Sequence, residues 1–157
     1  MFLRQPGRPG PFGALLDESA RAAGDFCRVL ELFTPARFAE ERPGNDPNTV
    51  SPRAIALYVC GAARRYSDYI RRARGMESVE RFEYPPSRLA RPSDARGLLV
   101  EAHHYAEETL EGLFDANYEA VRALEFTVRW GPRYDPEMLL EHAVCHLLRH
   151  RRQLERW

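Results

Sequence analysis

The sequence contains no lysine: all 23 basic residues are arginine, and 23 acidic residues bring the formal net charge to zero. Without lysine, Schiff-base chemistry and a P-loop are excluded, because both use its side-chain amine. Without net charge, the chain has no general attraction to nucleic acid or to an anionic membrane surface. We therefore expect neither nucleic acid nor membrane among its partners.

Cysteine is scarce and long apolar runs are missing. Cys27, Cys60 and Cys145 form no CxxC pair, and an odd number does not complete a disulfide framework. No run of 18 apolar residues is present, and the first residues lack the apolar core of a secretory signal. These absences favour a protein of the reducing cytoplasm. We expect Cys60 and Cys145 to be small buried hydrophobes.

Apolar residues recur with a helical period in four stretches, which loops rich in proline and glycine separate. Ser51, Ser93 and Asp135 stand where the N-caps of three of these helices belong, and Gly75 follows the second helix as a stop signal. The predicted helices cover residues 13–33, 51–75, 93–114 and 135–157.

The connections complete the predicted fold. The linkers are long for a bundle in which each helix runs antiparallel to the one before it. Their length indicates crossover connections, or loops that cover one end of the bundle. Apolar and polar residues alternate over 124–130, as in a strand or small hairpin. The sequence therefore predicts an all-α fold, a four-helix bundle with long connections and a short extended segment before the last helix. It forms a single domain over residues 1–157, with residues 1–12 as a flexible arm.

Three of the five histidines stand four residues apart, at His142, His146 and His150. Each step of four turns about 40° around a helix, so two neighbouring imidazoles can bind one ion but all three cannot. Two histidines of one helix need a further ligand from elsewhere. The alternative is a buried helix face whose histidines bond to polar neighbours, and the spacing alone leaves both open.

The last helix, LLEHAVCHLLRHRRQLERW, resembles the closing helix of the DinB-like superfamily of small four-helix-bundle proteins. In that family this helix often reads His-x3-His, then a basic residue, a small or basic one, and Gln, which His146, His150, Arg151, Arg152 and Gln153 match. The stretch SPRAIALYVCGAARRYSDYI is similar to the family's second helix, which often begins Ser-Pro-Arg. The resemblance covers nearly the whole chain in layout and these two helices in detail.

The resemblance implies a metal site that joins a histidine of the second helix to His146 and His150. Here the second-helix position is Tyr58, and a nearby glutamate of the family is Ala63. A neutral phenol is a poor zinc ligand, although a phenolate binds Fe(III). The implied cofactor is a divalent transition metal (Zn, Ni, Mn or Fe), with Tyr58 and His142 as further candidate ligands.

Several arrangements would complete such a site. Tyr58 ligates directly, or a water or carboxylate fills the gap, or His103 or His104 of the third helix turns inward. His103, His104 and Gln153 are otherwise candidates to orient the ligands through hydrogen bonds. In the remaining alternative no metal binds, and Tyr58 hydrogen-bonds one of the two imidazoles in a polar core network.

Three functional hypotheses follow. The first is an enzyme, because some members of the superfamily join a low-molecular-weight thiol to an electrophile with the help of a metal. The resemblance therefore implies a small-molecule thiol or electrophile as a partner. Arginines of the loops would bind the carboxylate of the thiol. The second hypothesis is a non-catalytic bundle, stress-related or partner-binding, which forms a homodimer. The third is a pocket for an aromatic or lipid-like molecule under the loops RFEYPP and FTVRWGPRY. The arginines considered are Arg37, Arg42, Arg129 and Arg133.

Overall fold

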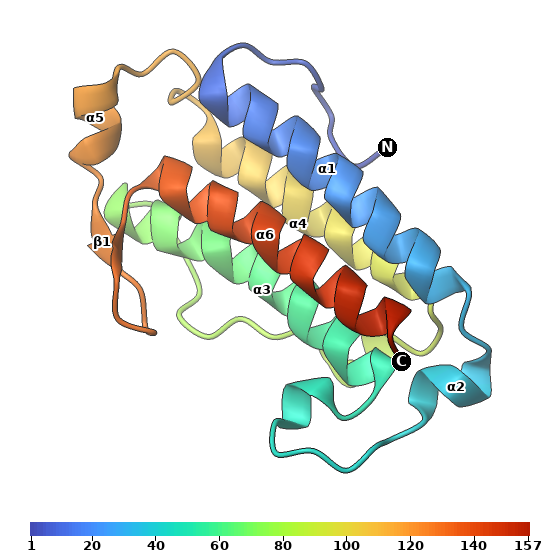
Figure 1. The fold of residues 1–157 in the computed structure, drawn as a ribbon. Helices are drawn as coiled ribbons and strands as arrows, with labels where there is room; N and C mark the ends of the chain where they lie inside the picture. Colours follow the sequence, from blue (N-terminus) through green and yellow to red (C-terminus); the bar gives the residue numbers. More distant parts are fainter.

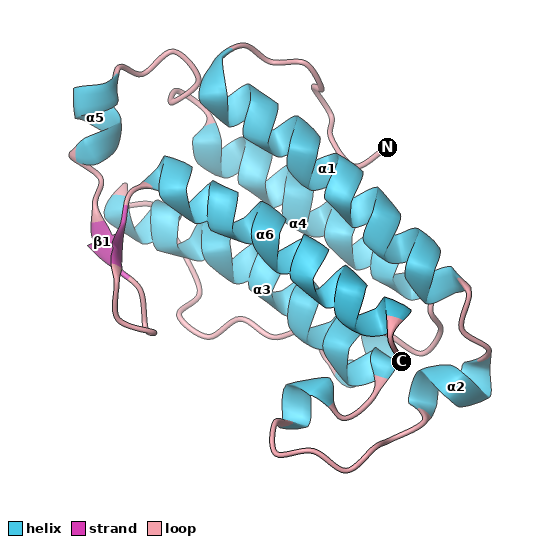
Figure 2. Ribbon diagram, in the orientation of Figure 1, coloured by secondary structure: helices cyan, strands magenta, loops and turns pink.

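The structure, a computed structural model, describes residues 1–157 and is mostly helical, with 62% helix and 3% strand. This confirms the predicted all-α class. Four of the helices have 17 residues or more, and these long helices lie side by side (Figures 1 and 2). None of the helices has the length and apolar character that crossing a membrane requires. The long helices are α1 (Gly10–Glu31), α3 (Pro52–Ala73), α4 (Asp94–Leu110) and α6 (Pro136–Glu155).

The ends of these helices follow the predicted signals, with one exception. Ser51 and Asp135 each accept a backbone N–H from the first turn of their helix, at 3.0 and 2.9 Å. Gly75 adopts a φ of 69° just beyond α3, a conformation that favours glycine at a helix end. Ser93 makes no capping bond. Instead the Asp94 carboxylate accepts a backbone N–H from three residues earlier, at 2.8 Å.

The linker from α3 to α4 runs back along α3, so that the two helices point the same way (Figure 1). The guanidinium of Arg65, in the middle of α3, donates to the carbonyl of Phe82 at 2.9 Å. Arg53, in the first turn of α3, donates to the carbonyl of Leu89, also at 2.9 Å. The return path confirms that the long linkers include a crossover connection.

Short helices and two short strands lie in the connections between the long helices. A two-stranded antiparallel hairpin pairs Phe126 with Tyr134, which confirms the extended segment before the last helix. The short helices were not predicted, because a single turn has no apolar period to detect. The short elements are α2 (Pro35–Ala39), η1 (Pro47–Thr49), η2 (Pro86–Arg88), α5 (Tyr118–Arg122), β1 (Phe126–Thr127) and β2 (Arg133–Tyr134).

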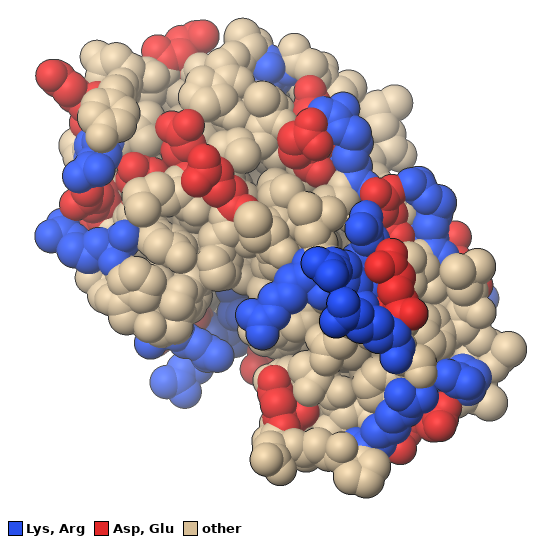
Figure 3. Space-filling model, in the orientation of Figure 1, with Lys and Arg blue, Asp and Glu red and all other residues tan.

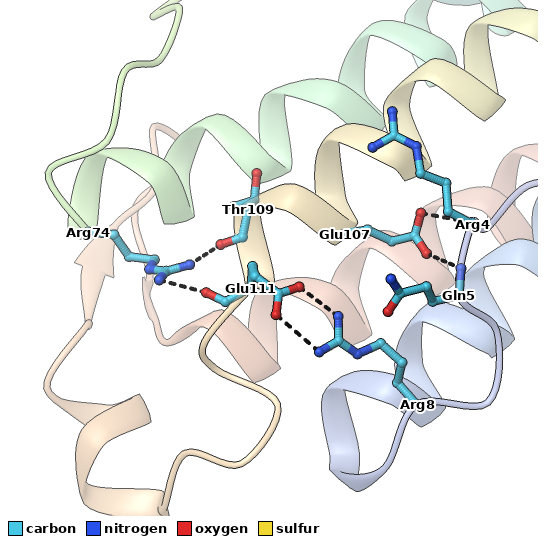
Figure 4. A network of polar contacts seen from close by, with 7 residues as sticks. All are labelled: Arg4, Gln5, Arg8, Arg74, Glu107, Thr109 and Glu111. Atoms are coloured by element: carbon cyan, nitrogen blue, oxygen red, sulfur yellow. Dashed lines mark hydrogen bonds and ion pairs between the residues drawn. The ribbon is translucent and has the colours of Figure 1, made fainter.

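The N-terminal segment packs against the long helices, which corrects the expectation of a flexible arm over residues 1–12. Leu3 is only 3% exposed. The backbone N–H groups of Arg4 and Gln5 both donate to the carboxylate of Glu107 on α4, at 2.9 and 2.8 Å (Figure 4). Two hydrogen bonds to one carboxylate and a buried leucine hold the segment in place, and neither contact follows from local sequence.

The core consists of two apolar clusters, one toward each end of the long helices. One contains 17 buried residues, including Phe26 and Leu147; the other contains 14, including Ile70 and Leu139. Neither cluster includes His146, which follows the second cluster along α6 and precedes the first. His103 on α4 likewise lies between residues of the two clusters, so two buried histidines stand where the clusters meet.

Candidate functional site

The structure brings together the three side chains that the histidine motif pointed to. His146 and His150 on α6 are 8% and 5% exposed, and their ring centroids lie 4.5 Å apart. The ring of Tyr58 on α3 meets both, edge to face, with centroid distances of 5.2 and 5.5 Å. The turn of one helix and the contact of α3 with α6 thus place two imidazoles beside one phenol.

Each of the two imidazoles has an Nε2 atom that makes no hydrogen bond. Nδ1 of His150 bonds to Oε1 of Gln153 at 2.9 Å, so Nδ1 carries the proton and Nε2 keeps its lone pair. Nε2 of His146 is buried and has no hydrogen-bond partner. Tyr58 makes ring contacts with both histidines but no hydrogen bond to either. The bond from the phenol to an imidazole, which the metal-free alternative included, is not formed.

Burial keeps both imidazoles neutral at pH 7. It lowers the pKa of His146 to about 3, and the neighbouring His150 contributes in the same direction. Burial also lowers the pKa of His150, although its bond to Gln153 opposes this. A neutral imidazole is the form that binds a metal or accepts a hydrogen bond.

His142 lies apart from this pair. Its ring stacks on Trp130 at a centroid distance of 5.0 Å, and its Nδ1 is 3.4 Å from the hydroxyl of Tyr134. The rings of His142 and His146 are 6.3 Å apart, farther than those of His146 and His150. His142 thus belongs to an aromatic cluster next to the hairpin.

The histidines of α4 do not complete the pair. His103 is buried and uses both ring nitrogens: Nδ1–H donates to the carbonyl of Leu99 at 2.7 Å, and the hydroxyl of Ser19 lies 3.0 Å from Nε2. It therefore has no free nitrogen to turn toward α6, which corrects its role as a replacement ligand. His103 does line a cavity of about 30 Å³ that His146 also lines. His104 is half-buried and outside that cavity.

The side chains present supply part of a metal site. No group of three or more His, Cys, Asp or Glu side chains is arranged to hold a metal ion. The donors are two neutral imidazoles, of which His146 has an unpartnered buried nitrogen, beside the phenol of Tyr58. Such a set fits a transition metal when a bound small molecule or solvent supplies the remaining ligands.

The two imidazoles and the phenol form part of the wall of a cleft of about 1910 Å³ between α3, α6 and three loops. Residues of the loops RFEYPP and FTVRWGPRY line it, as the third hypothesis placed them. The lining combines aromatic and other apolar side chains with many basic ones, which the third hypothesis did not include. Seven arginines face the cleft: Arg65, Arg72, Arg81, Arg129, Arg149, Arg152 and Arg156.

Of the four loop arginines that were expected to hold a carboxylate, only Arg129 lines the cleft. Arg37 and Arg42 both donate to the backbone carbonyl of Trp157. Arg133 pairs with a glutamate at 2.9 Å. Sequence reasoning missed Arg149, Arg152 and Arg156 of α6, which lie on an exposed stripe of the helix beside the histidine face.

Cys60 and Cys145 have different surroundings. Cys60 is fully buried, as predicted, and burial raises the pKa of its thiol. Cys145 is exposed and lines the cleft, which corrects its assignment as a buried hydrophobe. It lies about 100° around α6 from His146, which places it at the cleft surface and away from the helix contact.

No family model matches the chain, and no curated protein sequence matches it. The resemblance to the DinB-like superfamily therefore rests on the motifs in α3 and α6 and on the layout of the helices.

Proposed function

We propose that the protein is a DinB-like four-helix-bundle enzyme of the metal-dependent thiol-transferase type. Its substrates would be a low-molecular-weight thiol and an electrophile bound in the cleft, and it would act in the cytoplasm without nucleic acid or membrane partners. The observation that carries the proposal is the buried Nε2 of His146, which has no partner and lies beside His150. An unpaired buried nitrogen costs stability, so its presence beside a second free imidazole favours a ligand.

In this proposal His146 and His150 hold a divalent transition metal such as Zn, Ni, Mn or Fe. When bound, the metal lowers the pKa of the substrate thiol and so favours the thiolate. Gln153 orients His150 by accepting its Nδ1–H. The ring of Tyr58 restricts the space beside both imidazoles. Because this chain supplies only these two imidazoles, the small molecule or solvent would provide the remaining ligands.

Elemental analysis of protein purified without a polyhistidine tag tests the metal. We expect one transition metal per chain, lost in His146→Ala and His150→Ala. Tyr58→His would supply a third imidazole and strengthen binding, whereas Tyr58→Phe, the matched control, would change it little. Thiol consumption is then measured with a panel of thiols and electrophiles. No metal uptake together with no thiol binding at millimolar concentration would overturn the proposal.

A second candidate is a non-catalytic bundle, stress-related or partner-binding, whose histidines form a metal-free polar network. It is favoured by the absence of a three-ligand cluster and by Tyr58 at the position of the family's histidine. In this case the wild-type protein takes up no metal, Tyr58→His gains a site, and His146→Ala alters only the melting temperature. Size-exclusion chromatography with light scattering tests the homodimer that this candidate includes.

A further inference from the structure

Ion pairing divides the arginines of the chain into two groups. Eleven of the sixteen arginines outside the cleft form ion pairs with carboxylates, whereas none of the seven that line it does. The three acidic residues of the cleft lining, Asp46, Glu80 and Glu83, form no ion pair either. A chain with equal numbers of acids and bases thus leaves an excess of positive charge in one place.

The cleft arginines come from several elements and face a common space. Arg149, Arg152 and Arg156 follow one another at helical spacing on α6, next to the histidine pair. Figure 3 shows basic side chains gathered over the C-terminal half of this helix. Arg81 and Arg129 reach the cleft from the two loops. Like charges at this spacing destabilise a helix slightly, so their retention without partners favours a bound anion.

Aromatic rings lie in the same cleft. Trp130 is 43% exposed, and the ring of Tyr69 meets its edge at a centroid distance of 6.1 Å. Both residues line the cleft. Arginine forks beside a partly exposed indole suit a ligand that combines anionic groups with an apolar body.

We propose that the cleft binds a small molecule carrying two or more carboxylate or phosphate groups. Arg149, Arg152 and Arg156 hold these groups from α6, and Arg81 and Arg129 hold them from the loops. A guanidinium donates two parallel hydrogen bonds to either kind of anion, whereas one anionic group would neutralise only part of the cluster. The inference rests on the proposed function for the ligand being a substrate, but binding itself requires neither the histidines nor a metal.

The two tryptophans of the chain, Trp130 and Trp157, both line the cleft, so intrinsic fluorescence reports binding there. Protein freed of metal on a chelating resin is titrated with propane-1,2,3-tricarboxylate, with pyrophosphate and with acetate at equal ionic strength. We expect saturable changes with the first two and none with acetate. Tighter binding of propane-1,2,3-tricarboxylate would indicate a natural ligand with carboxylates, and tighter binding of pyrophosphate one with phosphates. Added sodium chloride should weaken both, because it screens the arginines.

The charge-matched variants are Arg149→Gln with Arg152→Gln in the cleft, and Arg21→Gln with Arg96→Gln outside it. We expect the first pair to weaken binding about tenfold or more, since it removes charge-assisted hydrogen bonds, and the second to leave it unchanged. The first pair should also keep its melting temperature, because its guanidinium groups have no partner in the folded protein. Equal binding by both pairs, or no saturation by either polyanion, would overturn the inference. If the polyanions bind but protein as purified contains no transition metal and consumes no thiol, the proposed function is overturned and the inference stands.

Discussion

At the scale of single residues, His146 carries the clearest consequence of burial. Its folded pKa of about 3 lies below the ordinary value of about 6.5, so below pH 6.5 the unfolded chain takes up a proton that the folded chain does not. Stability is therefore lost as the pH falls from 6.5 toward 3. We expect this residue to contribute a loss of about 2 kcal/mol between pH 6.5 and 5.

Urea denaturation of metal-free protein across pH 5–7 measures this loss. In His146→Leu the slope should become shallower but not vanish, because burial also lowers the pKa values of His103, His142 and His150. An unchanged slope in the variant would show that His146 is protonated as readily in the folded chain as in the unfolded one.

Spacing predicted some residues of the site and missed others for a definable reason. Four-residue steps place His146 and His150 on one face, and that face does meet Tyr58. The same rule could not show that Cys145 borders a cleft, or that His103 bonds to Ser19. A helical period identifies which residues share a face, whereas the partner of each face depends on distant parts of the chain.

At the scale of elements, local signals predicted the long helices and the hairpin, but not the path of the chain between them. The return of residues 74–93 along α3 depends on bonds such as that from Arg65 to the carbonyl of Phe82. The packed N-terminal segment depends on Glu107, about a hundred residues away in sequence. Such contacts join residues whose types alone do not specify a partner.

The two serines that precede α3 and α4 allow a matched test of local capping. Ser51 accepts a backbone N–H through its hydroxyl, whereas Ser93 makes no such bond. We expect Ser51→Ala to lower the free energy of unfolding by about 1 kcal/mol, and Ser93→Ala to change it by less than about 0.5 kcal/mol. Thermal and urea denaturation measure both variants. Equal losses would mean that Ser93 stabilises α4 through its side chain after all.

At the scale of the whole molecule, the two apolar clusters meet at a level that also holds two buried histidines. His103 and His146 lie there, on α4 and α6, around the cavity of about 30 Å³. A continuous apolar core would stabilise the fold more, because a buried nitrogen without a partner costs about 1–3 kcal/mol. Proteins commonly keep such locally unfavourable groups where function requires them.

Replacing His146 by a similar-sized apolar side chain tests this argument. His146→Leu removes the unpartnered Nε2 and adds apolar contact between the clusters, so we expect the free energy of unfolding at pH 7 to rise by about 1–2 kcal/mol. His146→Ala should instead lower it by about 2 kcal/mol, because the smaller side chain enlarges the cavity. Urea denaturation of metal-free protein compares the two. If leucine destabilises as much as alanine, Nε2 is satisfied in solution by a water in that cavity, and the histidine then belongs to the stable core.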